Sequence, residues 1–398
     1  MPRRGSRTLL VLLPLCLLGA AVPGPQSASA SPSAASGGIH RFEPEFMATN
    51  HSYTKAQAVA QAKEFDVIAG LRGSLDKYVA AMKAANPKLT LLVYMNGGYS
   101  ANDNGSKYQG SWYEHGTKAK RIKSRAFGSY LMDVGSTGWR RHIAALCLKL
   151  RKASGYDGCF LDSLGPAALQ PGYVTALPVN RDTGKIWKRK DWLEATSSLA
   201  QLVKSKLGAP PLVVNGVTNG ISYFDSGGST GVLTNGIDGG MVELFTRPPT
   251  VPLSQHRTVA SWLKDVDMLV DAGTRGRSLM CVTKAWAHGS AAKKTQTHRF
   301  ALGTFLLGTN GRSYFSFLDS HVTNKTDAVW TADLGAALGH YSKGSGVYQR
   351  VFAAGRILVN PSGVSHTVKL PRPYVTQGGT TVKAVTLVPY SAAILTLP

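Results

Sequence analysis

The sequence predicts an α/β protein, a (β/α)8 barrel followed by a small antiparallel β-domain. Eight short apolar runs rich in β-branched and aromatic residues alternate with longer segments of helical spacing, which is typical of a parallel sheet. From about residue 339 onward the pattern changes to short alternating stretches separated by Gly and Pro. A chain of 398 residues accommodates both parts, since one barrel takes more than about 200 residues. No Gly-rich phosphate loop follows the first runs, so a doubly wound sheet is the weaker alternative.

Residues 1–38 precede the predicted barrel. A basic start, an apolar run from Leu9 to Val22 and the small-residue triplet at 28–30 are typical of a secretory signal peptide at residues 1–30. The apolar run falls short of the ~20 residues that a membrane span needs, so we expect no span. Residues 31–38, SPSAASGG, form a predicted flexible linker. We therefore expect a secreted, extracellular protein with a catalytic barrel at residues 39–338 and a β-rich accessory domain at residues 339–398.

Eight predicted strands make up the barrel. They are residues 40–46, 65–71, 89–96, 157–163, 211–217, 239–245, 278–286 and 312–318. Two of the intervening helices carry end signals: one begins at the N-cap Ser136 and stops at Gly155, and the other begins at the N-cap Asp191 and stops at Gly208. In such a barrel the catalytic groups sit at the carboxyl ends of the strands, so polar residues there are the candidates for chemistry.

The fourth predicted strand, in GYDGCFLDS, has an aspartate near each end. Side chains alternate along a strand, so Asp162 shares a face with Phe160 and Gly158. We expect Asp162 to point into the barrel mouth as a catalytic carboxylate, and Asp157, at the strand entry, to be structural. A capping role for Asp162 is the alternative, but no helical pattern begins directly after it.

Glu243 is the predicted second carboxylate. Glycoside cleavage usually needs two carboxyl groups across the bond. Met241, Glu243 and Phe245 alternate onto one face, and the charge comes late in an apolar run. The alternative is a structural ion pair of Glu243 with Arg247 or Lys284.

Polar or aromatic residues also close the neighbouring strands. They are Tyr94, Asn96, Asn215, Lys284 and Trp286. An aromatic face can stack on a sugar ring, and amides and a lysine can hydrogen-bond hydroxyl or acidic groups. We predict that these residues bind substrate.

The composition bounds the partners and cofactors. A formal charge of +23 attracts anionic polymers, although a bias toward solubility explains it equally well. The densest basic runs, at 117–125 and 185–190, fall in predicted loops, and no nucleic-acid-binding motif accompanies them, so we expect no nucleic-acid partner. The sequence carries no indication of oligomeric state. Asn50, Asn104 and Asn324 head Asn-X-Ser/Thr acceptors for glycosylation in a eukaryotic host.

Three cysteines follow the predicted signal peptide: Cys147, Cys159 and Cys281. Each lies among apolar residues, and we expect all three to be buried and unpaired, because so few in a chain of this length do not make a disulfide framework. The sequence has no C-x-x-C motif and no paired histidines, so we expect no metal and no cofactor.

Several motifs together resemble a known family. GYDGCFLDS, VVNG, MVELF, SYFSF and the tail YQRVFAAGRILVNPS are similar, in this order, to the hypothetical glycosyl hydrolase-like barrels related to endo-α-1,4-polygalactosaminidases. The resemblance covers about residue 40 to the end. It implies a (β/α)8 barrel with Asp162 and Glu243 as strand-end carboxylates and a β-rich accessory domain. A basic chain would repel a cationic polygalactosamine at low salt, which argues against that substrate.

These observations predict a secreted glycoside hydrolase that cleaves a neutral or anionic polysaccharide of the cell wall or extracellular space. Asp162 is the expected nucleophile or base, and Glu243 the expected general acid. The alternative is a barrel that binds carbohydrate without cleaving it. Hydrolysis requires both carboxylates to face one site, whereas a binding protein needs only aromatic and amide contacts. A third alternative is a basic protein held at anionic surfaces by charge alone.

Overall fold

The computed structural model describes residues 39–100, 103–225, 229–320 and 332–398. The predicted signal peptide, the linker and the acceptor Asn324 lie outside the described residues.

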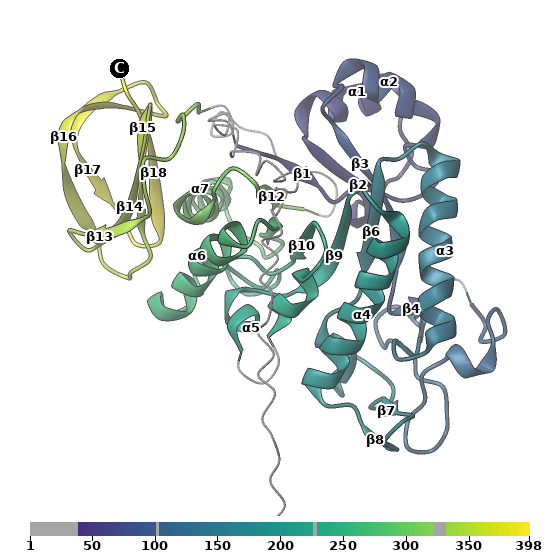
Figure 1. The fold of residues 1–398 in the computed structure, drawn as a ribbon. Coiled ribbons are helices and arrows are strands. Elements are labelled where there is room, and N and C mark those ends of the chain that lie inside the picture. The colour runs from purple at the N-terminus through teal and green to yellow at the C-terminus, as the bar shows by residue number, and fades with distance from the viewer. Residues whose placement is uncertain (1–38, 101–102, 226–228, 321–331) are drawn as a thin grey trace, which may run out of the picture. The chain divides into compact units, whose positions relative to one another are not determined.

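Eight parallel strands form the predicted barrel (Figure 1). Their bounds are β1 (Phe42–Glu43), β2 (Val67–Gly70), β3 (Thr90–Asn96), β6 (Gly158–Asp162), β9 (Leu212–Val217), β10 (Gly239–Val242), β11 (Ser278–Lys284) and β12 (Tyr314–Leu318). They pair in that order, and a parallel bridge between Arg41 and Phe315 links the first strand to the last, so the barrel is nearly closed. All eight lie inside the predicted runs, and the predicted fold class is confirmed.

Helices cover the outside of the barrel. They are α1 (Lys55–Glu64), α2 (Val79–Ala85), α3 (Thr137–Ser154), α4 (Arg189–Leu207), α5 (Gly220–Phe224), α6 (Val259–Thr274) and α7 (Ala291–Gly308). As predicted, the Ser136 side chain caps α3, and Gly155 ends it with a φ of 71°. The predicted start of α4 is wrong, because the helix begins two residues before Asp191, which lies in its first turn. The buried Trp187 holds the preceding chain, and the helix starts directly after Lys188.

The barrel interior is filled by alternate residues of the strands. They are Phe42, Val67, Ala69, Leu92, Phe160, Val213, Met241, Met280, Val282 and Leu318. This confirms the inward face predicted for Phe160 and Met241. The prediction that Phe245 shares the face of Met241 is wrong. The register of β10 against β9 shifts after Met241 and the strand ends at Val242, so Phe245 packs outside the barrel against Phe315.

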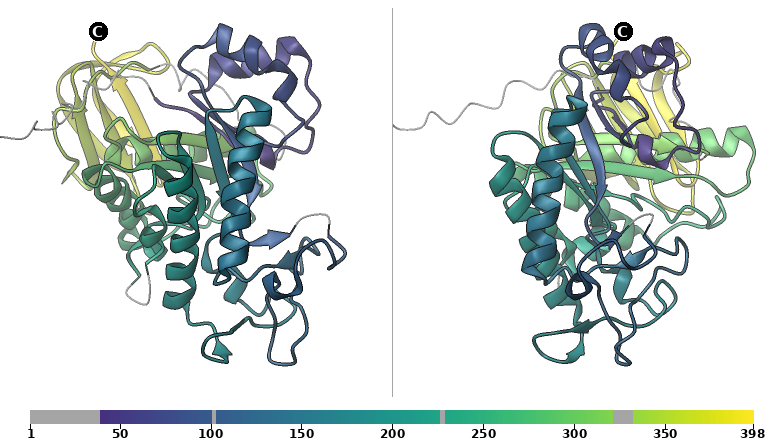
Figure 2. Two further views of the ribbon diagram at one scale, coloured as in Figure 1. Left: turned by 45° about the vertical axis from the view of Figure 1, so that its right-hand side comes forward. Right: turned by 90° about the vertical axis from the view of Figure 1, so that its right-hand side faces the viewer.

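An antiparallel sheet follows the barrel (Figures 1 and 2). Its strands are β13 (Ser342–Gly344), β14 (Val347–Phe352), β15 (Gly355–Asn360), β16 (His366–Thr376), β17 (Thr381–Leu387) and β18 (Ser391–Thr396). They curl into a half-barrel in the order β13-β14-β15-β18-β16-β17. The sheet packs on α7, where the buried Arg350 of β14 donates hydrogen bonds of 3.1 Å to the carbonyl oxygens of Leu306 and Leu307.

Two long connections leave the carboxyl ends of β3 and β6 and pack together. They carry the short strand pairs β4 (Tyr99–Ser100) with β5 (Tyr130–Leu131), and β7 (Val179–Asn180) with β8 (Lys185–Ile186). Figure 1 shows β4 beside α3, and β7 and β8 below the lower end of α4. Their shared apolar core includes Ile122, Leu131, Val174 and Trp187. We call the described residues of 97–136 and 163–188 the loop subdomain.

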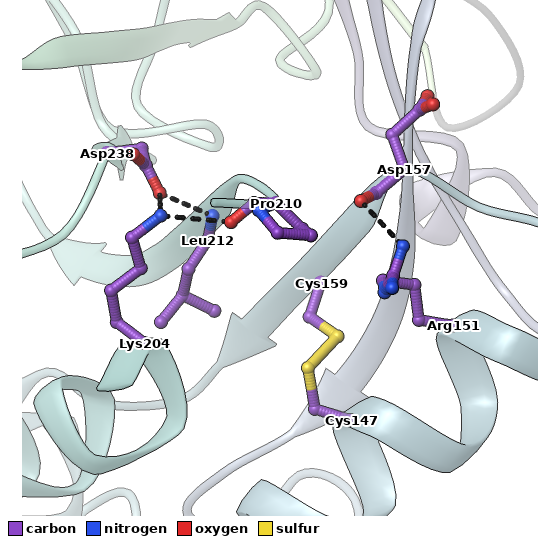
Figure 3. The surroundings of a disulfide bond; sticks show 8 residues. All are labelled: Cys147, Arg151, Asp157, Cys159, Lys204, Pro210, Leu212 and Asp238. Carbon is purple, nitrogen blue, oxygen red and sulfur yellow. Dashed lines mark hydrogen bonds and ion pairs between the residues drawn. A yellow bond between two sulfur atoms is a disulfide. The ribbon is translucent and has the colours of Figure 1, made fainter. Parts of the chain in front are cut away.

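A disulfide joins Cys147 of α3 to Cys159 of β6 (Figure 3). The prediction of unpaired cysteines is therefore wrong for these two, while Cys281 is buried and free as predicted. Helix α3 returns along the sheet to the strand that follows it. Cys147 lies on the buried face of the helix and Cys159 on the outward face of the strand, so the two side chains meet.

The entry ends of β6 and β9 are held by aspartate and lysine side chains. Asp157 accepts a hydrogen bond of 2.7 Å from the Leu91 amide and forms an ion pair with Lys83. In the same way Asp238 accepts one of 2.7 Å from the Leu212 amide and forms an ion pair of 2.8 Å with Lys204 (Figure 3). Asp157 thus has the structural surroundings that its position suggested.

Candidate active site

Polar side chains from five neighbouring segments meet at the carboxyl end of the barrel. Tyr94 comes from β3, Asp162 ends β6, Asn215 lies in β9, Glu243 directly follows β10, and Lys284 ends β11. Each stands two positions after an inward-facing apolar residue of its strand, and for Glu243 the register shift of β10 lies between the two. Parallel strands end at the same edge of a sheet, so the barrel brings the five together.

Asp162 accepts three hydrogen bonds. Tyr94 Oη donates to Asp162 Oδ2 at 2.6 Å, Asn215 Nδ2 donates to Oδ1 at 2.7 Å, and the backbone N–H of Ser163 donates to Oδ1 at 2.7 Å. The carboxyl group is therefore fixed in one orientation.

The Asn215 amide joins Asp162 to Glu243. Its Nδ2, which carries two hydrogens, also donates to Glu243 Oε2 at 3.0 Å. Lys284 Nζ donates to the other oxygen, Oε1, at 2.7 Å. Lys284 is buried with 4% of its side chain exposed, whereas 36% of the Glu243 side chain is exposed. The two carboxyl groups are thus linked through one amide, and one of them also forms an ion pair.

The surroundings shift the pKa values of the two carboxyl groups in opposite directions. Burial, and then the negative charge of Glu243, raise the pKa of Asp162 above its usual range, and the three hydrogen bonds only partly offset this. Burial also acts to raise the pKa of Glu243, but the charge and hydrogen bond of Lys284, with the bond from Asn215, outweigh it and hold that pKa below its usual range. Of the two carboxyl groups, Asp162 is therefore the easier to protonate and Glu243 the easier to ionise.

The backbone is strained directly after Asp162. Ser163 has a φ of 64°, which few residues other than glycine adopt. Asn96 Nδ2 donates to Ser163 Oγ at 3.0 Å, and Asn96 Oδ1 accepts from the amides of Gly98 and Tyr99. Asn96 thus ties the two connections of the loop subdomain together beside Asp162, and its contact with substrate stays a prediction. Strain of this kind is common at functional sites.

Trp286 lies beside the linked residues rather than among them. Its Nε1 donates to the carbonyl oxygen of Ser320 at 3.1 Å, and Lys284 Nζ lies 4.9 Å from its ring centroid. The ring is partly buried against the inner barrel core. Of the residues predicted from sequence, Tyr94, Asn215 and Lys284 contact the carboxylates directly.

Two aromatic residues at the site were missed. Phe46, in the turn after β1, is partly exposed and stacks on Tyr94 with ring centroids 4.6 Å apart. Phe46 and Phe42 are separated by an even number of positions in the first predicted strand, so strand alternation already predicted that they share a face. Tyr173 packs against Tyr99 with ring centroids 6.4 Å apart, and the pKa of its phenol is raised by burial and then by the charges of Asp162 and Glu243. Tyr173 lies in an irregular loop, where no periodicity indicates direction.

Neither a metal site nor a membrane span is found in the described parts of the chain. No group of three or more His, Cys, Asp or Glu residues there could hold a metal ion. None of the described helices has the length and apolar character needed to cross a bilayer.

Residues 83–356 match the profile of Hypothetical glycosyl hydrolase family 15. The chain belongs to this family. The matched region runs from before β3 to the start of β15 and contains all of the site residues predicted from sequence. No curated protein matches the chain. A relation of this family 15 barrel to polygalactosaminidase-type enzymes stays a prediction.

Solved structures share the fold at low identity. Eubacterium rectale Amy13B has a TM-score of 0.53 and 10% identity, over 92% of this chain and 97% of that chain. The noncanonic maltogenic alpha-amylase AmyB of Thermotoga neapolitana has a TM-score of 0.53 and 8% identity, over 91% and 99%. A pullulanase type I of Bacillus subtilis, solved with maltose, has a TM-score of 0.50 and 11% identity, over 92% and 70%. At these identities the likeness shows the fold alone.

Proposed function

We propose that this protein is a secreted glycoside hydrolase that cleaves an extracellular or cell-wall polysaccharide with retention of anomeric configuration. The observation that carries the proposal is the Asn215 amide, which donates to Asp162 and to Glu243 at 2.7 and 3.0 Å. Two bonds that share one nitrogen hold Asp162 Oδ1 and Glu243 Oε2 less than about 6 Å apart, which is nearer to the carboxyl separation of retaining enzymes, about 5 to 5.5 Å, than to that of inverting ones, about 6.5 to 9.5 Å. A barrel that only binds carbohydrate has no need of two linked carboxyl groups.

Lys284 decides the proposed roles of the two carboxyl groups. Its ammonium group binds Glu243 at 2.7 Å and favours the ionised form, which suits a nucleophile. Asp162 has no cationic partner among the described ion pairs and lies beside the Glu243 charge, so it holds the proton and suits a general acid. This assignment reverses the roles that we expected from the sequence.

The proposed reaction has two steps. A carboxylate oxygen of Glu243 attacks the anomeric carbon, while the proton of Asp162 passes to the glycosidic oxygen and the bond between that oxygen and the anomeric carbon breaks. The leaving sugar departs as an alcohol, and a glycosyl ester of Glu243 remains. Asp162 then takes a proton from a water molecule, whose oxygen attacks the anomeric carbon and frees Glu243. The ester carries no charge, so the pKa of Asp162 falls after the first step and favours its role as a base in the second.

The aromatic groups around the pair suit a sugar ring. Phe46 stacks on Tyr94, which donates to Asp162, and the Trp286 ring lies 4.9 Å from Lys284 Nζ, which donates to Glu243, so each carboxyl group has an aromatic ring near its hydrogen-bond partner. The hydrogen bond from Tyr94 to Asp162 thereby joins the ring that Phe46 stacks on to the proposed general acid. We propose that the exposed faces of Phe46 and Trp286 hold the sugars that flank the cleaved bond.

Two features support the proposed secretion. The first residues have the pattern of a signal peptide. The Cys147–Cys159 disulfide is the kind of bond that persists in oxidising compartments outside the cytosol. Asn50 and Asn104 are exposed, so glycosylation in a eukaryotic host stays a prediction for both.

Release of reducing ends from a panel of neutral and acidic polysaccharides tests the activity. We expect Asp162→Asn and Glu243→Gln to lose at least about 10³-fold in kcat, as expected for groups that act in the transition state. Asp157→Asn makes the same chemical change at the other end of β6 and should keep the activity. Full activity of either site variant on a confirmed substrate would show that the replaced residue is not catalytic.

Rescue by azide separates the two roles. With an activated aryl glycoside, azide should restore the variant of the nucleophile and give a product of inverted anomeric configuration. With the variant of the acid and base it should give a product of retained configuration. We expect inversion for the Glu243 variant and retention for the Asp162 variant. The opposite pattern would make Asp162 the nucleophile and Glu243 the acid and base, with the same two residues still catalytic.

A further inference from the structure

The loop subdomain brings together two basic segments that are far apart in the sequence. Residues 117–125 include Lys118, Lys120 and Lys123, and residues 185–190 begin with Lys185. Four short segments lie side by side, and the two outer ones belong to these basic segments. β8 pairs with β7, the amide of Val179 in β7 donates to the His115 carbonyl oxygen at 3.0 Å, and His115 bridges to Arg121. Neighbouring strands lie about 4.8 Å apart, so three such steps bring the two basic segments within about 15 Å of each other at the surface of the loop subdomain.

We define this surface, the basic patch, by six cations. They are Lys118, Lys120, Lys123, Arg125, Lys185 and Lys188. All are exposed except Lys123, which is partly buried. None of the six forms an ion pair with an acidic residue in the described part of the chain, whereas the neighbouring Arg189 and Lys190 pair with Asp225 and Glu194. The charge of the patch therefore stays uncompensated, apart from Asp182 in the turn between β7 and β8.

The patch leads to the candidate active site. The amide of Arg125 donates to the carbonyl oxygen of Tyr173 at 2.9 Å, and Ser124 bridges to Val174. The Tyr173 ring packs against Tyr99, with ring centroids 6.4 Å apart, and the Tyr99 amide donates to Asn96 beside the site. Tyr173 thus connects one end of the patch to the site.

The site itself does not oppose an acidic substrate. Lys284 offsets the charge of Glu243 through an ion pair of 2.7 Å, and the raised pKa of Asp162 makes that carboxyl group easier to protonate. A negatively charged chain therefore meets a cationic surface and then a site whose negative charge is largely offset.

We infer that the substrate is an acidic polysaccharide, and that the basic patch binds its negatively charged sugars beside the cleaved bond. This inference rests on the proposed hydrolase function. A row of cations beside a site raises the local concentration of an anionic ligand and its association rate by about 10- to 1,000-fold at low salt. The effect on catalysis should therefore appear in KM rather than in kcat.

The test compares two variants of equal net charge. K118Q/K120Q/K185Q/K188Q removes four exposed lysines of the patch whose side chains form no described hydrogen bond or ion pair. The control, K88Q/K149Q/K152Q/K206Q, removes four exposed lysines near the strand entries: Lys88 precedes β3, and the others lie toward the ends of α3 and α4. Circular dichroism checks that both are folded.

Binding is measured at low and high salt with polygalacturonate, dextran sulfate, dextran and polyglutamate. We expect the patch variant to bind at least one acidic polysaccharide about tenfold or more weakly than the control at low salt, with the difference lost at about 0.5 M salt. Equal losses in both variants would show that total charge, not the patch, attracts the polymer, and would overturn the inference. The inference would also be overturned if polyglutamate bound as strongly as the acidic polysaccharides and lost as much affinity in the patch variant.

Hydrolysis distinguishes this inference from the proposed function. An acidic polysaccharide whose KM rises about tenfold in the patch variant, at unchanged kcat, supports both. Hydrolysis of neutral polysaccharides alone overturns the inference and leaves the hydrolase proposal standing. Binding through the patch without hydrolysis of any polysaccharide overturns the proposed function, and the assignment of a substrate with it.

Discussion

Lys284→Met tests whether the ion pair sets the ionisation of Glu243. The change keeps the length of a buried side chain but removes its charge. At 2.7 Å and an effective dielectric of about 20, two opposite unit charges attract by about 6 kcal/mol. Water screens this strongly, because 36% of the Glu243 side chain is exposed, and we take about 2 kcal/mol as the remaining effect. That energy shifts the equilibrium between ionised and protonated Glu243 about 30-fold toward the protonated form.

The assay is the pH dependence of kcat/KM on a polysaccharide that the protein hydrolyses. In the proposed mechanism Glu243 must be ionised, so the rate falls as the pH drops through its pKa. Removing Lys284 raises that pKa, and we expect the acid limb of the profile to move to higher pH by about one to two pH units. The alkaline limb belongs to Asp162 and should move less.

Lys204→Met is the matched control. It removes an ion pair of 2.8 Å with Asp238 at the opposite end of the strands. It should lower the free energy of unfolding and leave the pH profile in place. An acid limb that stays where it is in Lys284→Met, or moves to lower pH, would refute the idea that an ionised Glu243 is needed for the reaction.

Other predictions follow from the same contacts. Wild-type kcat/KM should be bell-shaped in pH, because Glu243 has to lose its proton and Asp162 has to keep its own; a profile with one limb would contradict the two-carboxylate mechanism. Replacing Cys147 by Ser should lower the free energy of unfolding by about 3 kcal/mol in urea under oxidising conditions, and under reducing conditions the difference should disappear. Asp157→Asn should cost about 1 kcal/mol in the same assay, because it removes the charge of a partly exposed ion pair. N-terminal sequencing of the exported protein should find Ser31 first, and retention of residues 1–30 would contradict cleavage.

The order of the strands and the direction of their side chains could be predicted because both depend on local pattern. Alternation along GCFLD and GGMV determines which residues face inward, and the end of each apolar run marks where a polar group can stand. Asp162, Asn215 and Lys284 were found from these signals alone. The prediction failed for Phe245, because the shift in register of β10 is a property of its pairing with β9.

Contacts between distant segments could not be predicted in this way. The Cys147–Cys159 bond depends on how α3 lies against β6, and three cysteines among apolar residues give no sign of which two meet. Tyr173 lies in an irregular loop, where neither the helical nor the strand period of side chains applies.

By itself the sequence determined that this protein is a (β/α)8 barrel with carboxylates at the ends of its fourth and sixth strands, because strand period, helix caps and turn residues act over a few neighbouring positions. Only the tertiary structure decided how those groups are connected and how their pKa values shift. The Asn215 amide between Asp162 and Glu243, the buried Lys284 that lowers the pKa of Glu243, and the pairing that joins two basic segments are all contacts across the chain. Charge interactions and hydrogen bonds depend on distances of a few ångströms in space, and those distances are set when the strands pack side by side.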